Sequence, residues 1–85
     1  MKTIIVTITD EKNSFFLDVE LPVGYPVSIM YPFLVDLLNQ NQSVIKFKET
    51  GFLMVANRQK KIIPPNSSLE EAGIWNGDYL SILQR

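Results

Sequence analysis

The stretch SLEEAGIWNGDYLSIL, residues 68–83, decides the fold, because it joins a capped turn, a glycine stop, a tight reversal and a strand. Ser68 and Glu71 have the spacing of a capping box, in which each side chain accepts a hydrogen bond from the other residue's backbone N–H. Gly73 suits the left-handed conformation that ends a helical turn. The sequence therefore predicts one short 3-10 or helical turn before the last strand.

A reversal and a closing strand complete this stretch. Asn76, Gly77 and Asp78 are residue types that tolerate the backbone angles of a tight turn. Residues 79–83, YLSIL, are mostly aromatic or aliphatic and predict a strand. The order of these features predicts the fold of the chain better than it predicts a chemical activity.

The chain begins with a pattern typical of a β-hairpin. Residues 2–9 alternate with a period of two, so that Ile4, Val6 and Ile8 share one face. A polar turn at residues 10–14 follows, and residues 15–21 alternate again. The sequence predicts two antiparallel strands.

A helix is predicted next, from about Ile29 to Gln40. Residues 22–26, PVGYP, break the second strand, and Ser28 has the side chain of a helix cap. Pro32 is expected to lie in the first helical turn, where a missing N–H is tolerated. The apolar residues that recur at helical spacing are Phe33, Leu34, Leu37 and Leu38.

The second half of the chain is less regular. Residues 42–51 are compatible with a loop or an irregular strand, and both interpretations remain open. Residues 52–56, FLMVA, predict a strand, residues 57–60 a polar turn, and residues 61–63 a short returning strand stopped by two prolines.

Together these elements predict a single α+β domain over residues 1–85. One amphipathic helix covers one face of a mixed sheet of four to five strands, because that arrangement buries both apolar surfaces in a chain this small. If the last strand lies parallel to the first and between the first and third, the helix supplies a right-handed crossover. This is the β-grasp plan.

Composition argues against most catalytic chemistry. The chain has no Cys and no His, so thiolate metal sites, iron–sulfur ligation and the usual nucleophile-activating pairs are absent from it. Its net charge of −1 gives no electrostatic reason to bind nucleic acid. The acidic residues between Asp10 and Glu20 lack the spacing of a calcium loop. We expect no catalytic residue, no metal and no cofactor.

The sequence has neither a basic, apolar leader nor an apolar run near the ~20 residues that cross a bilayer. We therefore expect a cytoplasmic protein without direct membrane insertion. The basic turn at Arg58, Lys60 and Lys61 is interpreted as a solvated turn. Trp75 is interpreted as a ring that shields the end of the core more than as an anchor for a partner.

The C-terminal residues carry a resemblance. Ser68-Leu69, Ile74 and the Leu80/Ile82 pair resemble the ubiquitin-like superfamily. More narrowly, LPVGYPVSIMYPFLVDLL at residues 21–38, SLEEAGI and NGDYLSIL look like the YukD/EsaB-like family of WXG100 (type VII) secretion. The resemblance implies a non-catalytic cytosolic accessory factor that contacts the secretion machinery, for example its membrane-anchored ATPase.

Two other functions are alternatives to this one. A ubiquitin-like modifier or sulfur carrier needs a flexible C-terminal Gly-Gly, whereas this sequence ends Leu83-Gln84-Arg85, so conjugation is disfavoured. A β-grasp adaptor unrelated to secretion is the third alternative. WXG100 proteins and an FtsK-like ATPase encoded beside this gene would favour the secretion role over that adaptor.

Strand alternation predicts which side chains are available to a partner. We expect the helix-facing set to be Ile4, Val6, Ile8, Leu17, Val19, Leu21, Leu53, Val55, Leu80 and Ile82. The protein-binding candidates then point away from the helix, and they are Ile5, Phe16, Phe52, Met54, Tyr79 and Leu83.

With the last strand in the middle, Ile5, Leu83 and Met54 are expected to be neighbours, and a charge at Met54 is expected to leave the fold intact. The alternative is that residues 42–51 cover this patch or that isolated apolar residues are tolerated there.

Overall fold

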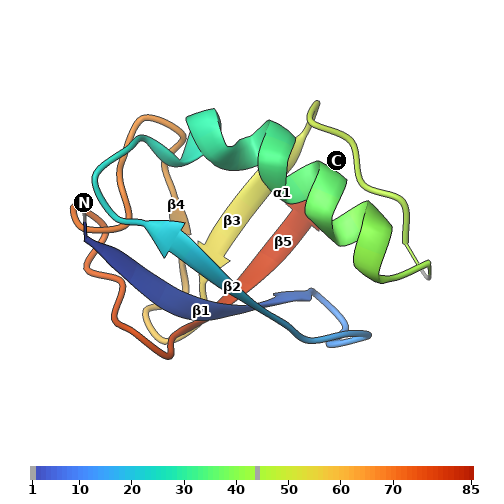
Figure 1. The fold of residues 1–85 in the computed structure, drawn as a ribbon, viewed down its shortest axis with the longest axis horizontal. Coiled ribbons are helices and arrows are strands. Elements are labelled where there is room, and N and C mark those ends of the chain that lie inside the picture. The colour runs from blue at the N-terminus through green and yellow to red at the C-terminus, as the bar shows by residue number, and fades with distance from the viewer. Residues whose placement is uncertain (1, 44) are drawn as a thin grey trace.

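The computed structural model describes residues 2–43 and 45–85. Within these residues the element order is β1 (Thr3–Asp10), β2 (Leu17–Pro22), α1 (Val27–Asn41), β3 (Phe52–Ala56), β4 (Lys61–Ile63) and β5 (Tyr79–Gln84). Figure 1 shows α1 lying across one face of the sheet, with β5 running through the middle of the strands. The predicted helix and strands are therefore confirmed in type and order.

The strands form one mixed sheet in the order β2-β1-β5-β3-β4. β1 pairs antiparallel with β2 and parallel with β5, and β3 is antiparallel to both β4 and β5. The last strand thus lies between the first and third and runs parallel to the first, as the β-grasp plan requires. A parallel pair needs a crossover, which α1 and β3–β4 supply.

The core lies between α1 and the face of the sheet that it covers. Val6, Ile8 and Leu80 from the sheet and Leu34 and Leu38 from the helix are fully buried. The sequence predicted which alternate side chains of β1, β2 and β5 face the helix, and the buried positions agree with that prediction. Leu17, at the start of β2, is only partly buried.

The predicted faces of β3 are wrong. Phe52 and Met54 are 2% and 0% exposed, whereas Leu53 and Val55 are partly exposed. Met54 lies opposite Ile82 of β5, and directly opposite residues share a face. Because all five residues of β3 are apolar, their pattern does not reveal which face is buried, and the pairing decides it. Phe52 and Met54 are core residues, and a charge at Met54 is now expected to unfold the chain.

The start of α1 also differs from the sequence expectation. The N-cap is Pro26, without a side-chain cap, and the N–H groups of Val27 and Ser28 donate to the carbonyls of Ser67 and Pro65 at 2.9 and 3.1 Å. A distant loop therefore satisfies the donors that a capping side chain would satisfy. Pro32 lies inside the helix beyond its first turn, with an exposed ring.

The described residues of 42–51 form a loop that closes one end of the core. The Asn39 side chain donates to the Phe47 carbonyl at 3.0 Å and accepts from the Phe47 N–H at 2.8 Å. The Phe47 ring is 3% exposed and meets the rings of Phe15 and Phe52 edge to face at 6.0 and 6.1 Å. Between the two open interpretations, the loop is the one observed.

The capped turn that decided the fold is confirmed. The Ser68 N–H donates to the Glu71 carboxylate at 2.9 Å, and the Glu71 N–H donates to Ser68 Oγ at 3.0 Å. Gly73 has a φ of +72°, which ends the turn in the left-handed conformation. The turn holds the chain against the start of α1 through a bridge between Pro26 and Ser68.

Candidate protein-binding surface on the sheet

The face of the sheet turned away from α1, called the outer sheet face below, is lined by alternate residues of the paired strands. Register places the following side chains on it: Ile5 and Thr7 of β1, Asp18 and Glu20 of β2, Tyr79, Ser81 and Leu83 of β5, Leu53 and Val55 of β3, and Ile62 of β4. No helix or strand of the described residues packs on these side chains as α1 packs on the inner face.

An exposed aromatic pair lies on this face, at the starts of β2 and β5. Phe16 and Tyr79 are 59% and 50% exposed, and their rings meet edge to face at 6.1 Å between centroids. Tyr79 lies opposite Thr7 in the parallel β1–β5 ladder. Ile5, two residues earlier in β1, is 49% exposed. These side chains leave large apolar area in contact with solvent.

The turn before β5 positions Ile5. The Ile5 N–H donates to Asn76 Oδ1 at 2.8 Å, and the Gly77 N–H donates to the Ile5 carbonyl at 2.7 Å. The Thr7 N–H in turn donates to the Asp78 carbonyl at 2.9 Å. Gly77 adopts a φ of +89°, a conformation that glycine reaches without steric strain. The tight turn predicted at Asn76-Gly77-Asp78 is therefore present, and it is hydrogen-bonded to β1.

The structure brings together only part of the predicted site. Ile5, Phe16 and Tyr79 lie exposed on the outer sheet face, and Leu83 is partly exposed opposite Leu53. The described residues of the 42–51 loop leave the first three exposed. Phe52 and Met54 are on the inner face and leave the candidate set.

The expected neighbourhood of Ile5, Leu83 and Met54 does not form. Because Tyr79 pairs with Thr7, Leu83 lies six residues further along the sheet than Ile5, which is about 20 Å. Leu53 and Val55, which the sequence placed on the inner face, take the outer positions next to β5. Val55 also lies opposite Ile62 of β4, so an apolar strip extends from Leu83 towards that edge.

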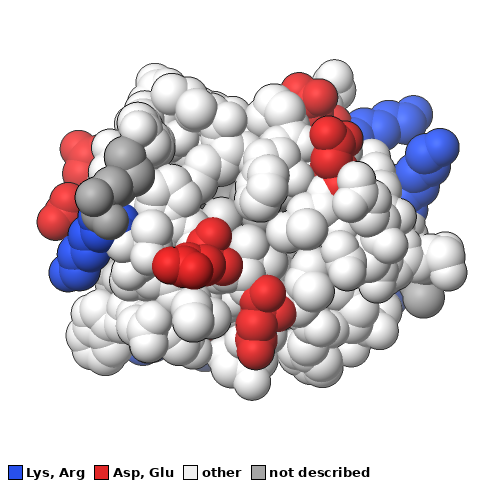
Figure 2. Space-filling model, viewed as in Figure 1, with Lys and Arg blue, Asp and Glu red and all other residues white. Residues whose placement is uncertain are grey.

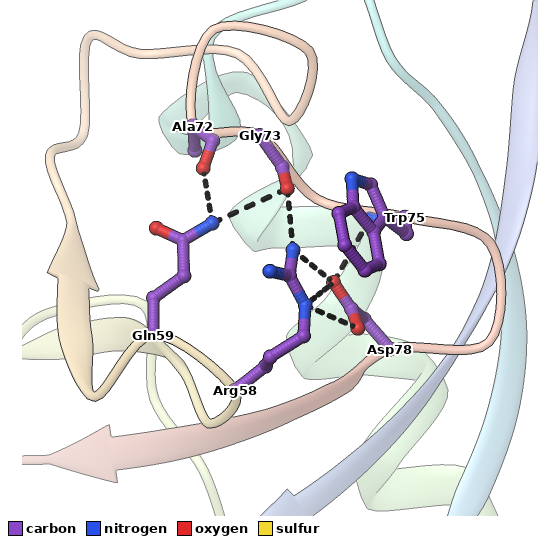
Figure 3. Close-up of polar contacts among 6 residues, drawn as sticks. All are labelled: Arg58, Gln59, Ala72, Gly73, Trp75 and Asp78. Carbon is purple, nitrogen blue, oxygen red and sulfur yellow. Dashed lines mark hydrogen bonds and ion pairs between the residues drawn. The ribbon is translucent and has the colours of Figure 1, made fainter.

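Arg58, Trp75 and Asp78 form a cluster (Figure 3), and Arg58 and Asp78 line the same hollow as the aromatic pair. Arg58 Nε donates to Asp78 Oδ1 at 3.1 Å, and one of its terminal nitrogens donates to the Gly73 carbonyl at 2.7 Å. The guanidinium lies 3.6 Å from the centre of the Trp75 ring, a stacked cation–π geometry. Gln59 adds a 2.8 Å bond to the Ala72 carbonyl. The β3–β4 turn is thereby tied to residues 72–78.

Sequence reasoning missed this cluster. Trp75 is 63% exposed, so the interpretation of its ring as a shield for the core is wrong. Arg58 is not a freely solvated turn residue, because Asp78 and the Trp75 ring hold it. Arg58 and Asp78 are twenty residues apart in the sequence. No local sequence pattern therefore predicts that they pair.

Arg58 also sets the ionisation of Asp78. Burial disfavours the carboxylate and acts to raise the pKa of Asp78. The hydrogen bond from Arg58, the Trp75 N–H bond at 2.9 Å and the Arg58 charge together outweigh burial and hold the pKa below its usual value. The pair is therefore ionised at neutral pH, and Asp78 neutralises the charge of Arg58.

Phe16, Tyr79, Arg58 and Asp78 surround a shallow hollow of about 450 Å³. Its lining combines aromatic rings with an arginine that is already held in place, the residue types that contribute most at protein interfaces. No group of three or more His, Cys, Asp or Glu side chains in the described part of the chain is arranged to hold a metal ion. No helix of residues 2–43 and 45–85 is long and apolar enough to cross a membrane.

The fold is that of a ubiquitin-like β-grasp protein. The ubiquitin of Caldiarchaeum subterraneum superposes with a TM-score of 0.75 at 12% identity, over 99% of this chain and 95% of that chain. The ubiquitin-like domain of the Mycobacterium tuberculosis type VII secretion system protein EccD1 gives a TM-score of 0.69 at 21% identity, over 98% of this chain and 99% of that chain. The EccD5 ubiquitin-like domain of Mycobacterium xenopi gives 0.75 at 20% identity, over 100% and 99%.

The sequence itself makes a narrower assignment. The family described as "WXG100 protein secretion system (Wss), protein YukD" matches residues 3–82, and the chain belongs to that family. No curated protein matches the sequence at a significant level. The resemblance stated from residues 21–38 and 68–83 is thus confirmed.

Proposed function

We propose that this chain is a non-catalytic, cytoplasmic protein-binding module of WXG100-type secretion that docks through its outer sheet face. The observation that carries the proposal is the uncovered apolar group formed by Ile5, Phe16 and Tyr79. The family match supports the link to secretion.

Physical chemistry favours contact with another protein at this face. An apolar ring that stays in water adds little to the stability of so small a fold, and a cluster of such rings is typical of an interface. Phe16 and Tyr79 meet edge to face, so a partner would contact two rings that are already packed against each other.

The partner proposed is a component of the type VII secretion machinery, for example its membrane-anchored ATPase. Structural support comes from the EccD1 neighbour, whose ubiquitin-like domain is described as part of a type VII secretion system protein. The proposal needs no covalent chemistry, metal or cofactor.

The test compares two exposed apolar sites on opposite sides of the molecule. A Phe16→Ser and Tyr79→Ser variant removes the aromatic pair, and Ile29→Ser removes a side chain that is 63% exposed on α1. Binding to the purified cytosolic part of the secretion ATPase is measured by calorimetry, and export of a WXG100 substrate is measured in cells. We expect the double variant to lose at least about tenfold in affinity and to impair export, because hot-spot aromatic residues contribute more than about 1 kcal/mol each.

Ile29→Ser is expected to change neither the affinity for the ATPase nor the export of the substrate. Loss of binding in Ile29→Ser with retention in the double variant would move the docking site to the helix. Retention of full affinity and export in both variants would contradict docking through either surface.

A further inference from the structure

The outer sheet face carries charge of one sign. Asp18 and Glu20 of β2 are both exposed on it. Among its described positions on β1, β2, β3, β4 and β5 there is no Lys or Arg. Figure 2 shows acidic side chains lying over β2, whereas basic side chains lie towards the margins of that view. The apolar group thus has an acidic border on its β2 side.

The two carboxylates lie beside the exposed rings. Asp18 is opposite Thr7, and Thr7 is opposite Tyr79 on its other side, so Asp18 and Tyr79 are two strand spacings apart, about 10 Å. Phe16 precedes Asp18 by two residues, on the same side of the chain. Glu20 lies opposite Ile5. A cation between Asp18 and the two rings would therefore meet a carboxylate and aromatic faces together.

Hydroxyl groups already orient these acids. Thr7 Oγ1 donates to Asp18 Oδ1 at 2.6 Å, and Thr3 Oγ1 donates to a carboxylate oxygen of Glu20. Each bond uses one oxygen of the acid and leaves the other to accept from a partner. The two side chains consequently enter a complex with part of their rotational freedom already lost.

Among the described residues no basic side chain forms an ion pair with Asp18 or Glu20, and Lys2 lines a hollow beside Glu70 and Trp75. Arg58 is paired with Asp78 and stacked on Trp75. Lys12, in the turn between β1 and β2, lines a different hollow together with Phe47 and Ile82, both core residues. The negative charge of Asp18 and Glu20 is therefore available to a second molecule.

From this charge distribution we infer that the outer sheet face recognises a basic segment of its partner protein, in which an arginine or lysine stands beside an apolar side chain. The cation lies between the Asp18 carboxylate and the rings of Phe16 and Tyr79, and the apolar side chain packs on Ile5. Arginine suits the site best, because its planar guanidinium bonds a carboxylate and stacks on an aromatic ring at once. This inference rests on the proposed function and specifies the chemistry of the partner.

The first experiment uses synthetic peptides as probes. A short fluorescein-labelled peptide of alternating arginine and leucine is titrated against the full chain, beside a counterpart with glutamate for arginine and one with serine for leucine. We expect the arginine–leucine peptide to bind best, and its amide shift changes in nuclear magnetic resonance to cluster at Ile5, Thr7 and Tyr79. Equal binding of the glutamate peptide, or shift changes confined to α1, would overturn the inference.

The second experiment removes the charges and keeps the shape. Asp18→Asn with Glu20→Gln retains oxygens that accept from Thr7 and Thr3, and Asp36→Asn with Glu70→Gln is the matched control at exposed sites elsewhere. We expect the first variant to bind the arginine–leucine peptide about tenfold more weakly and to lose much of the salt dependence, with the control unchanged. Unchanged affinity in the first variant would refute the role of the acids.

The same variants separate this inference from the proposed function. If the secretion ATPase loses affinity for the Phe16/Tyr79 double variant but not for Asp18→Asn with Glu20→Gln, the docking face stands and the basic partner is refuted. If neither variant affects the ATPase while the peptide results hold, the face binds basic segments but the secretion partner is wrong. Self-association of the chain through this face, measured by light scattering, would refute the basic partner in favour of a second copy.

Discussion

The two faces of the sheet carry similar apolar side chains, but one face is buried and the other is exposed. Two adjacent residues of β3 show the difference. Met54 is fully buried against the helix side, whereas its neighbour Leu53 is partly exposed on the outer sheet face. Both are large and apolar. The difference is that α1 covers one face and nothing in the described residues covers the other in the same way. Apolar residues therefore contribute stability on one face and remain available for contact on the other.

A charge in β3 tests this comparison most severely. We expect Met54→Asp to abolish folding, because an unpaired carboxylate in the core costs several kcal/mol, comparable with the whole stability of a small domain. Circular dichroism during urea titration measures the loss. Leu53→Asp is the matched control and is expected to retain a cooperative transition. A folded Met54→Asp protein would show that the two faces of β3 are assigned incorrectly.

Two phenylalanines give the next largest contrast. Phe47→Ala is expected to destabilise the fold by about 3–5 kcal/mol, because its buried ring fills the end of the core against Phe15 and Phe52. Phe16→Ala removes the same ring from the outer sheet face and is expected to cost about 1 kcal/mol or less. Both values follow from chemical denaturation. Equal costs would remove the distinction between a structural ring and a contact ring.

At the border of the outer sheet face, Asp78→Asn is expected to destabilise the protein by about 1 kcal/mol at neutral pH, because it breaks the ion pair with Arg58. The folded state lowers the pKa of Asp78, so its carboxylate stabilises the fold above the ordinary pKa of an aspartate, and this contribution is lost as pH falls through the lowered value. Denaturation curves from neutral to acid pH should therefore converge for the two proteins. A constant difference at all pH values would exclude ionisation of Asp78 as the cause.

The smallest expected effect lies on the inner face. Tyr31 is 8% exposed, its ring packs 5.0 Å from that of Phe52, and its buried hydroxyl has no hydrogen-bond partner among the described residues. Burial accordingly raises the pKa of Tyr31. We expect Tyr31→Phe to be neutral or to stabilise the fold by up to about 1 kcal/mol, because it removes an unpaired polar group and keeps the ring. Thermal denaturation measures the change, and a clear destabilisation would indicate a bonded hydroxyl.

The sequence predicted what depends on local chemistry. The capping box of Ser68 and Glu71 and the faces of β1, where threonines alternate with aliphatic residues, follow from spacing alone. The faces of β3 do not, because FLMVA is apolar at every position and only pairing with β5 distinguishes its two sides. Without that register the candidate site included Phe52 and Met54 and omitted Leu53 and Val55.

The other differences depend on residues that are distant in sequence. The start of α1 needs no capping side chain because carbonyls near residue 66 receive its first N–H groups. Phe47 is held by an amide eight residues away, and Arg58 by a carboxylate twenty residues away. Such contacts are properties of the folded chain and have no periodic pattern by which a single sequence predicts them.

The turn at residues 76–78 has a consequence for how any partner approaches. β5 begins only opposite Thr7, so the earlier part of β1 has no strand on that side, and the turn occupies its hydrogen-bonding groups instead. A peptide cannot insert there as an additional strand, because the N–H and C=O of Ile5 are already bonded. The interior of the sheet is thus closed to backbone pairing beside the exposed rings. A ligand lying over Ile5 therefore contacts side chains there, and backbone pairing is left to the edge strands β2 and β4.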